Sequence, residues 1–123
     1  MTTTFASTRI VTDDLDGLVA FYEHVTGLTA SRPAPVFAEF RTAAGTFAIS
    51  SSQLTNRLYG PDVVRAAANQ TAFLEFQVPD TDAEFARLSD LEFVQEPTTM
   101  PWGNRSALLR DPDGNLVNLF TTP

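Results

Sequence analysis

The stretch Arg110–Phe120, RDPDGNLVNLF, is a tight polar turn between two apolar segments, and a weaker copy of it occurs earlier in the chain. The copy is Phe40–Ser50, FRTAAGTFAIS, which has an arginine and a glycine at matching places. A second pair of matching stretches precedes these, Thr12–Val19 and Val78–Phe85, and each reads as a strand that runs into a helix. Two pairs in the same order indicate one supersecondary unit used twice.

The repeat predicts an α+β protein made of two β-α-β-β-β units. We place the units at residues 5–52 and 70–122, with a connector at residues 53–69, inside a single domain of residues 1–123. Neither half has enough strands to enclose a core alone. We therefore expect the two sheets side by side as a curved mixed sheet, with the helices outside and a ligand groove between the two units.

The first unit begins with an expected strand at residues 5–12. A helix should follow, capped by Asp13 or Asp14 and ended by Gly27, because apolar residues recur at helical spacing between them. The Pro33–Pro35 segment should break the chain before two strands at residues 36–42 and 46–51.

The connector is the least regular stretch, and residues 62–68 could form a helix of two turns after Gly60 and Pro61. The second unit should start with a strand at residues 71–78. Thr81 and Glu84 form a plausible capping box for a helix through Leu88. From Phe93 the short run of antiparallel strands expected in the first unit repeats, and it ends with a strand at residues 116–121.

Composition excludes several kinds of chemistry. The 123 residues include 15 acidic and 8 basic side chains, a net charge of −7, which disfavours nucleic-acid binding and mildly favours a cationic ligand. All eight bases are arginine and cysteine is absent, so lysine Schiff bases, thiolates and cysteine-bound zinc are excluded. The amino terminus does not resemble a signal peptide and no stretch resembles a membrane span, so we expect a cytoplasmic, soluble protein without membrane contact.

The repeated unit, the stretch Asp14–Leu28 and the turn Asp111–Asn115 together resemble the vicinal oxygen chelate superfamily. That superfamily includes glyoxalase I, the extradiol dioxygenases, and the fosfomycin- and bleomycin-resistance proteins. The resemblance covers nearly the whole chain and implies the fold. It says little about activity, because one fold hosts many functions.

The resemblance implies metal ligands on the first and last strands of each unit. Mapped by motif spacing, these positions fall on Ser7, Ile49, Phe73 and Asn118, within about one residue. None is a strong ligand, because a catalytic divalent ion usually takes three His, Asp or Glu side chains. The only histidine, His24, falls near the carboxyl end of the first helix, where it suits the helix dipole. We therefore predict no metal and no cofactor.

Strand alternation predicts which side chains line the groove. If Ser7 and Phe73 point into it, so do Arg9 and Glu75, whereas Leu74 and its alternating neighbours pack on helices. Arg9 and Glu75 are equivalent in the two units. They could pair at the groove floor, tie the halves together, or contact a ligand, and one of them could lie in solvent at a strand end.

The aromatic residues favour a flat or apolar ligand. Most of them should be core, and Phe37, Phe47, Phe73 and Phe120 are the candidates for groove walls. Trp102 lies in a loop after Met100 and Pro101, where it could stack on a ligand, contact a second subunit or pack within the loop.

The arginines of the two copied turns, Arg41 and Arg110, have a structural interpretation, which is bonding to nearby carboxylates or carbonyls. Asp111, Asp113 and Asn115 likewise suit a turn, in which Gly114 supplies a positive φ. The turn thus explains the fold and not a reaction.

Three functional hypotheses remain. We favour a metal-free, bleomycin-resistance-type protein that sequesters an antibiotic or another aromatic small molecule, either cationic or neutral. Its predicted ligand-binding residues are Ser7, Arg9, Phe47, Phe73, Glu75, Trp102, Asn118 and Phe120. The alternative is a glyoxalase- or dioxygenase-like lyase, isomerase or oxygenase, either metal-dependent with unusual ligands or metal-independent. In the metal-independent enzyme Glu75 is the first candidate for the general base and Glu39 the second. The third is an interaction module without a small ligand. The resemblance also implies a homodimer.

Overall fold

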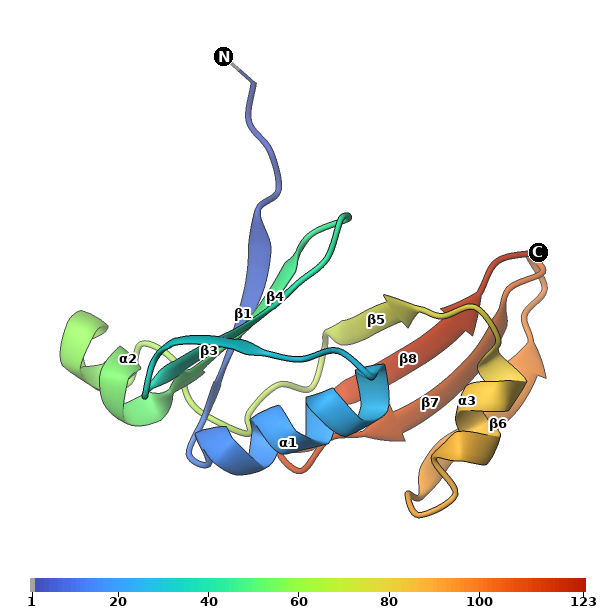
Figure 1. The fold of residues 1–123 in the computed structure, drawn as a ribbon. Coiled ribbons are helices and arrows are strands. Elements are labelled where there is room, and N and C mark those ends of the chain that lie inside the picture. Colours follow the sequence, from blue (N-terminus) through green and yellow to red (C-terminus); the bar gives the residue numbers. More distant parts are fainter. Residues whose placement is uncertain (1) are drawn as a thin grey trace. The chain divides into compact units, whose positions relative to one another are not determined.

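The computed structural model describes residues 2–123 and contains two compact units, the first ending at Ala68 and the second beginning at Asn69 (Figure 1). The elements of the first unit are β1 (Ser7–Thr12), α1 (Leu15–Thr26), β2 (Ser31–Ala34), β3 (Phe37–Arg41), β4 (Thr46–Ser51) and α2 (Ser52–Tyr59). Those of the second are β5 (Phe73–Gln77), α3 (Thr81–Arg87), β6 (Phe93–Thr99), β7 (Arg105–Arg110) and β8 (Leu116–Thr121).

Each unit forms its own four-stranded mixed sheet, with strand orders β1-β4-β3-β2 and β5-β8-β7-β6. The first strand of each unit runs parallel to the last one, and the remaining pairs are antiparallel. The α+β class and the twofold use of one β-α-β-β-β unit are confirmed. The single domain and the groove between the units stay predictions.

Helix α1 forms where its capping signals and apolar spacing predict it. The Asp14 side chain accepts a hydrogen bond from the Gly17 amide over 3.0 Å, and Gly27 ends the helix with a φ of 72°. Its buried face carries Leu15, Leu18, Val19, Tyr22 and Val25. His24 is exposed in the last turn, as expected from its place near the carboxyl end.

The core of the first unit is aromatic. The Tyr22 ring on α1 lies 4.7 Å from the Phe47 ring on β4, measured between centroids, in an edge-on contact. Phe47 in turn stacks on Phe40 of β3 at 5.9 Å, and the two residues are direct partners in the β3–β4 ladder. Aromatic pairs in this geometry add to the stabilisation that burial provides. They fix α1 to one face of the first sheet.

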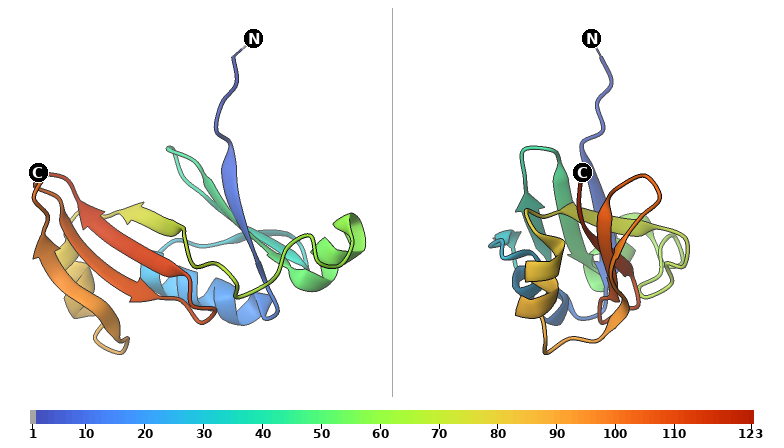
Figure 2. Two further views of the ribbon diagram at one scale, coloured as in Figure 1. Left: turned by 180° about the vertical axis from the view of Figure 1, so that it is seen from behind. Right: turned by 90° about the vertical axis from the view of Figure 1, so that its right-hand side faces the viewer.

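Helix α3 covers one face of the second sheet. It lies in front of that sheet in Figure 1 and behind it in the reverse view of Figure 2. The predicted cap was wrong by one residue, because Asp80 caps the helix by accepting from the Ala83 amide at 3.1 Å. The Thr81 hydroxyl instead donates to the Arg105 carbonyl over 2.8 Å, which ties the helix to β7.

The helix expected in the connector was wrong, and the expectation for the Pro33 segment was incomplete. Residues 62–68 are not helical: Asp62 and Ala67 have φ values of 70° and 59°, which no right-handed helix contains. The regular segment of the connector is α2, which starts where the Ser51 hydroxyl accepts from the Leu54 amide. The segment around Pro33 does not merely break the chain but forms β2, an edge strand, where proline is tolerated.

The β7–β8 turn has the structural role predicted for it. Asp111 is buried and accepts from the amides of Asp113 and Asn115, each at 2.9 Å. Gly114 has a φ of 85°, and its carbonyl accepts from Arg110. In the first unit Arg41 pairs with the Glu39 carboxylate at 3.1 Å. Both arginines therefore bond locally, as predicted.

Within residues 2–123, no helix combines the length and the apolar character needed to cross a membrane.

Candidate functional site

The second sheet has one face packed on α3 and one face that α3 does not cover. Along β5 the alternation is clear, because Leu74 is buried while Phe73, Glu75 and Gln77 are exposed. The ladder sets these three beside Leu116, Asn118 and Phe120 of β8. We call the surface formed by Phe73, Glu75, Gln77, Leu116, Asn118 and Phe120 the β5–β8 face.

A carboxylate and an amide meet at the centre of the β5–β8 face. Glu75 and Asn118 are direct ladder partners, and the Asn118 Nδ2 donates to Glu75 Oε2 over 2.9 Å. Asn118 is only 9% exposed, whereas Glu75 is exposed. The Oδ1 of Asn118 is buried and has no hydrogen-bond partner. The predicted site residues Glu75 and Asn118 are thus brought together, and their remaining free groups are acceptors.

Aromatic rings flank this pair. Phe73, two residues before Glu75 on the same face, is 54% exposed, and Phe120 is half-buried two residues after Asn118. Trp102 is 69% exposed in the turn between β6 and β7. A half-exposed ring next to a carboxylate on one sheet face offers a ligand both apolar contact area and a charge.

In the first unit two of the predicted site residues, Ser7 and Arg9, lie on the sheet face opposite α1. Ser7 and Arg9 are exposed on β1, and Arg9 is the ladder partner of Ala48. The Arg9 guanidinium lies 5.5 Å from the centroid of the Tyr59 ring and donates to the Tyr59 hydroxyl over 3.3 Å. This is a cation–π contact with α2.

Phe47 does not line this face. Its exposure is 8%, and its ring packs on Tyr22 and Phe40 on the α1 side of the sheet. Phe47 is therefore a core residue of the first unit, which corrects its assignment to a groove wall. The physical reason is strand alternation, since Phe47 and Arg9 are offset by one ladder position and so face opposite sides.

The register also corrects the predicted metal position Ile49. The turn between Arg110 and Leu116 is one residue longer than the turn between Arg41 and Thr46, although both pairs are ladder partners. The position equivalent to Asn118 is consequently Ala48, and Ile49 is a core residue with 0% exposure.

The donor set does not fit a catalytic metal ion. The corrected positions carry a serine hydroxyl, an alanine, a phenylalanine and an amide, at Ser7, Ala48, Phe73 and Asn118. Among residues 2–123, no three His, Cys, Asp or Glu side chains are grouped so that they could hold an ion. Two weak oxygen donors and two apolar side chains cannot replace the three strong ligands that such ions require.

The second candidate base, Glu39, is already engaged. It is the ladder partner of Ala48, and its carboxylate pairs with Arg41 at 3.1 Å. A base in an ion pair has to give up that interaction on protonation. Glu75, which accepts a hydrogen bond from the neutral amide of Asn118, is the better candidate.

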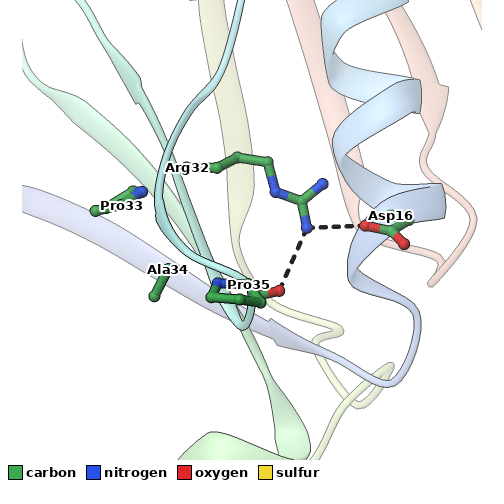
Figure 3. A pocket seen from close by; sticks show the side chains of 5 residues that line it. All are labelled: Asp16, Arg32, Pro33, Ala34 and Pro35. Carbon is green, nitrogen blue, oxygen red and sulfur yellow. Dashed lines mark hydrogen bonds and ion pairs between the residues drawn. The ribbon is translucent and has the colours of Figure 1, made fainter.

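The first unit also has an open recess, which sequence reasoning did not predict (Figure 3). It is lined by Asp16 of α1 and by residues 32–35. Arg32 spans it, paired with Asp16 at 2.8 Å and donating to the Pro35 carbonyl at 3.4 Å. Because its charged groups bond to one another, this recess connects α1 to β2 and offers little to a ligand.

Sequence reasoning missed Tyr59 and the helix that carries it. A signal was present, because Ser51 precedes Leu54 and Leu58, a cap followed by two leucines at i, i+4 spacing. The buried hydrogen bond between Ser50 and Thr55, at 3.1 Å, fixes α2 to β4.

Comparisons with known proteins agree with this architecture. A family model described as Glyoxalase/Bleomycin resistance protein/Dioxygenase superfamily matches residues 4–119. A search of curated proteins gives no significant match.

Solved structures of similar fold span nearly the whole chain. A glyoxalase/bleomycin resistance protein/dioxygenase from Nocardioides is 26% identical, with a TM-score of 0.79, covering 99% of this chain and 85% of its own. A protein of unknown function from Agrobacterium tumefaciens is 22% identical, with a TM-score of 0.85 and coverages of 100% and 97%. A lactoylglutathione lyase from the same organism is 24% identical, with a TM-score of 0.75 and coverages of 98% and 94%. The last two likenesses concern the fold alone.

Proposed function

Because the chain belongs to the glyoxalase/bleomycin resistance protein/dioxygenase superfamily, we propose that it is a metal-free protein that binds and sequesters a small aromatic cation. The observation that carries the proposal is the β5–β8 face, where the exposed Phe73 ring stands beside a carboxylate held by Asn118. A ring and an anion side by side suit a ligand that is both flat and positively charged.

Charge supports the cationic part of the proposal. The whole chain carries a net charge of −7, which raises the local concentration of cations at its surface. On β5 and β8 the only ionisable side chain is Glu75. A bound cation would therefore meet a carboxylate with no competing arginine on either strand.

The proposal can be tested by a thermal-shift screen of aromatic cations, bleomycin among them, and of divalent metal ions. A ligand that binds only the folded state raises the melting temperature. At a ligand concentration of 100 Kd it increases the free energy of unfolding by about 2.7 kcal/mol. We expect aromatic cations to raise it and Ni²⁺, Zn²⁺, Mn²⁺ and Fe²⁺ to leave it unchanged. Saturable stabilisation by a metal ion alone would contradict the proposal.

The matched variant for this screen is Phe73→Ala, with Val94→Ala as its control. Both side chains are exposed on strands of the second sheet, at 54% and 56%. Only Phe73 lies on the β5–β8 face beside Glu75, so Phe73→Ala alone should reduce the shift. Equal ligand-induced shifts of the melting temperature in the two variants would show that the β5–β8 face is not the binding site.

An enzyme of the same superfamily is the second candidate, because the amide of Asn118 orients one oxygen of Glu75 and leaves the other able to take a proton. This candidate differs from sequestration in one measurable property. A general base would exchange an acidic C–H of a bound ligand with solvent deuterium, which NMR detects. Glu75→Asp would slow such exchange, whereas a sequestering protein returns its ligand unlabelled.

The proposed assembly is a homodimer, and its support on this chain is Trp102, a large exposed ring in the β6–β7 turn. Tryptophan is enriched where protein surfaces meet. Sedimentation should give a dimer at micromolar concentration for the wild type and a larger monomer fraction for Trp102→Ala. A wild-type monomer at that concentration would refute the dimer and leave the ligand proposal intact.

A further inference from the structure

One polar atom of the Asn118 side chain has no hydrogen-bond partner, and this points to a ligand group that would bond to it. Its Nδ2 donates to Glu75, while its Oδ1 is buried and unpaired. The assignment of the two atoms follows from the contact itself, because a rotated amide would place Oδ1 against a carboxylate. A buried acceptor left without a donor costs about 1–3 kcal/mol.

The neighbours of Asn118 on the sheet do not supply the missing donor. Its ladder partner on β7 is Leu108, and the residues two positions away on its own strand are Leu116 and Phe120. All three are hydrocarbon side chains. On the other side lies Glu75, which when ionised only accepts. The centre of the β5–β8 face is thus an acceptor pair bordered by apolar side chains.

We propose that the ligand is a protonated amine or amidinium with at least two N–H donors, one bonding to Glu75 and another to the Oδ1 of Asn118. This inference rests on the proposed function and adds the hydrogen-bonding class of the cation. A quaternary ammonium would satisfy the charge of Glu75 and leave Oδ1 unpaired. Seating the N–H requires displacement of the atoms that cover Oδ1, and the exposed Glu75 side chain is hydrogen-bonded to the same amide group.

The test is a binding series in which the ring and the charge stay constant while the N–H count falls. Benzylammonium has three N–H groups, N,N-dimethylbenzylammonium has one and benzyltrimethylammonium has none. NMR titration of the full-length protein measures their dissociation constants. We expect at least a tenfold loss of affinity from three N–H groups to one, because a single N–H cannot satisfy both acceptors.

The variant Asn118→Leu separates hydrogen bonding from ligand bulk. It keeps a side chain of similar size and removes the acceptor, so the difference between the first two ligands should shrink to about twofold or less. Gln53→Leu is the matched control, since Gln53 is an exposed amide on α2 and is not part of the β5–β8 face. It should leave the difference unchanged. Asn118→Ala provides a second variant should leucine disturb the fold, which circular dichroism will show.

The outcomes separate the two proposals. Equal affinities across the series in the wild type would overturn this inference and leave the binding of aromatic cations standing. An undiminished difference in Asn118→Leu would also overturn it. Absence of binding by all three cations would overturn the proposed function together with the inference.

Discussion

The amide of Asn118 on β8 donates to the carboxylate of Glu75 on β5 over 2.9 Å, across a parallel ladder in which the two residues are direct partners. The equivalent positions of the first unit carry Ala48 and Arg9. The two units therefore share the same strand pairing but carry different side chains at these equivalent positions. One unit presents a carboxylate and an amide, and the other presents an arginine stacked on Tyr59.

Replacement of Glu75 by glutamine should weaken binding of an aromatic cation about tenfold, which corresponds to 1.4 kcal/mol. The change removes the charge and keeps the size, and Glu75 is exposed, so the melting temperature should stay within a degree or two. Glu92→Gln, at an exposed carboxylate outside the strands, is the control. If both variants weaken binding equally, the effect is one of net charge and not of the site.

Asn118→Leu should leave the stability of the free protein equal or raise it by about 1 kcal/mol, because it removes a buried unsatisfied acceptor and releases Glu75 to water. Urea unfolding measures this free energy. As a reference, Leu119→Ala, at 1% exposure on the same strand, should cost about 2–5 kcal/mol. A decrease of more than about 1 kcal/mol in the free energy of unfolding of Asn118→Leu would show that Asn118 stabilises the fold.

The two phenylalanines Phe47 and Phe73 should behave in opposite ways. Phe47→Ala removes a ring that is 8% exposed and contacts Tyr22, and it should cost about 3–5 kcal/mol. Phe73→Ala removes a ring that is 54% exposed and should change stability by less than about 1 kcal/mol. Chemical denaturation distinguishes them. Similar losses in both would indicate that Phe73 is also a core residue.

The ion pair between Asp82 of α3 and Arg105 of β7 gives the protein a pH-dependent contact. Arg105 donates to both carboxylate oxygens, at 2.9 and 3.1 Å, and these hydrogen bonds hold the pKa of Asp82 below its usual value. Its stabilisation is therefore present above the unfolded pKa of about 3.9 and is lost as pH falls through the lower, folded pKa.

Asp82→Asn should accordingly be less stable than the wild type at pH 7, by a small amount because the pair is exposed, and the gap should close on acidification below pH ~4. Urea midpoints measured along a pH series follow this convergence. A gap that stays constant down to pH 2 would show that the charge of Asp82 contributes nothing.

Much of the fold could be predicted from local signals. The α1 helix has a capping aspartate, apolar residues at helical spacing and a terminal glycine, and each of these acts within a few residues. The β7–β8 turn is equally local, because Asp111 and Gly114 determine its shape through their own backbone contacts. Such elements need no knowledge of distant neighbours.

The errors arose where a non-local pairing decides the outcome. The extra residue between Arg110 and Leu116 changes the ladder partner without changing the motif, and so it moved one predicted site position from Ala48 to Ile49. The segment around Pro33 becomes a strand only because β3 pairs with it. The contact between Arg9 and Tyr59 joins residues far apart in the sequence, and no spacing rule indicates it.

The most direct test of the account is a ¹H–¹⁵N NMR titration of the full-length protein with benzylammonium. Binding at the β5–β8 face predicts that the largest shifts occur at the backbone amides of β5 and β8 around Glu75 and at the side-chain amide of Asn118. Shifts confined to the recess around Arg32, or a spectrum unchanged at millimolar ligand, would contradict it.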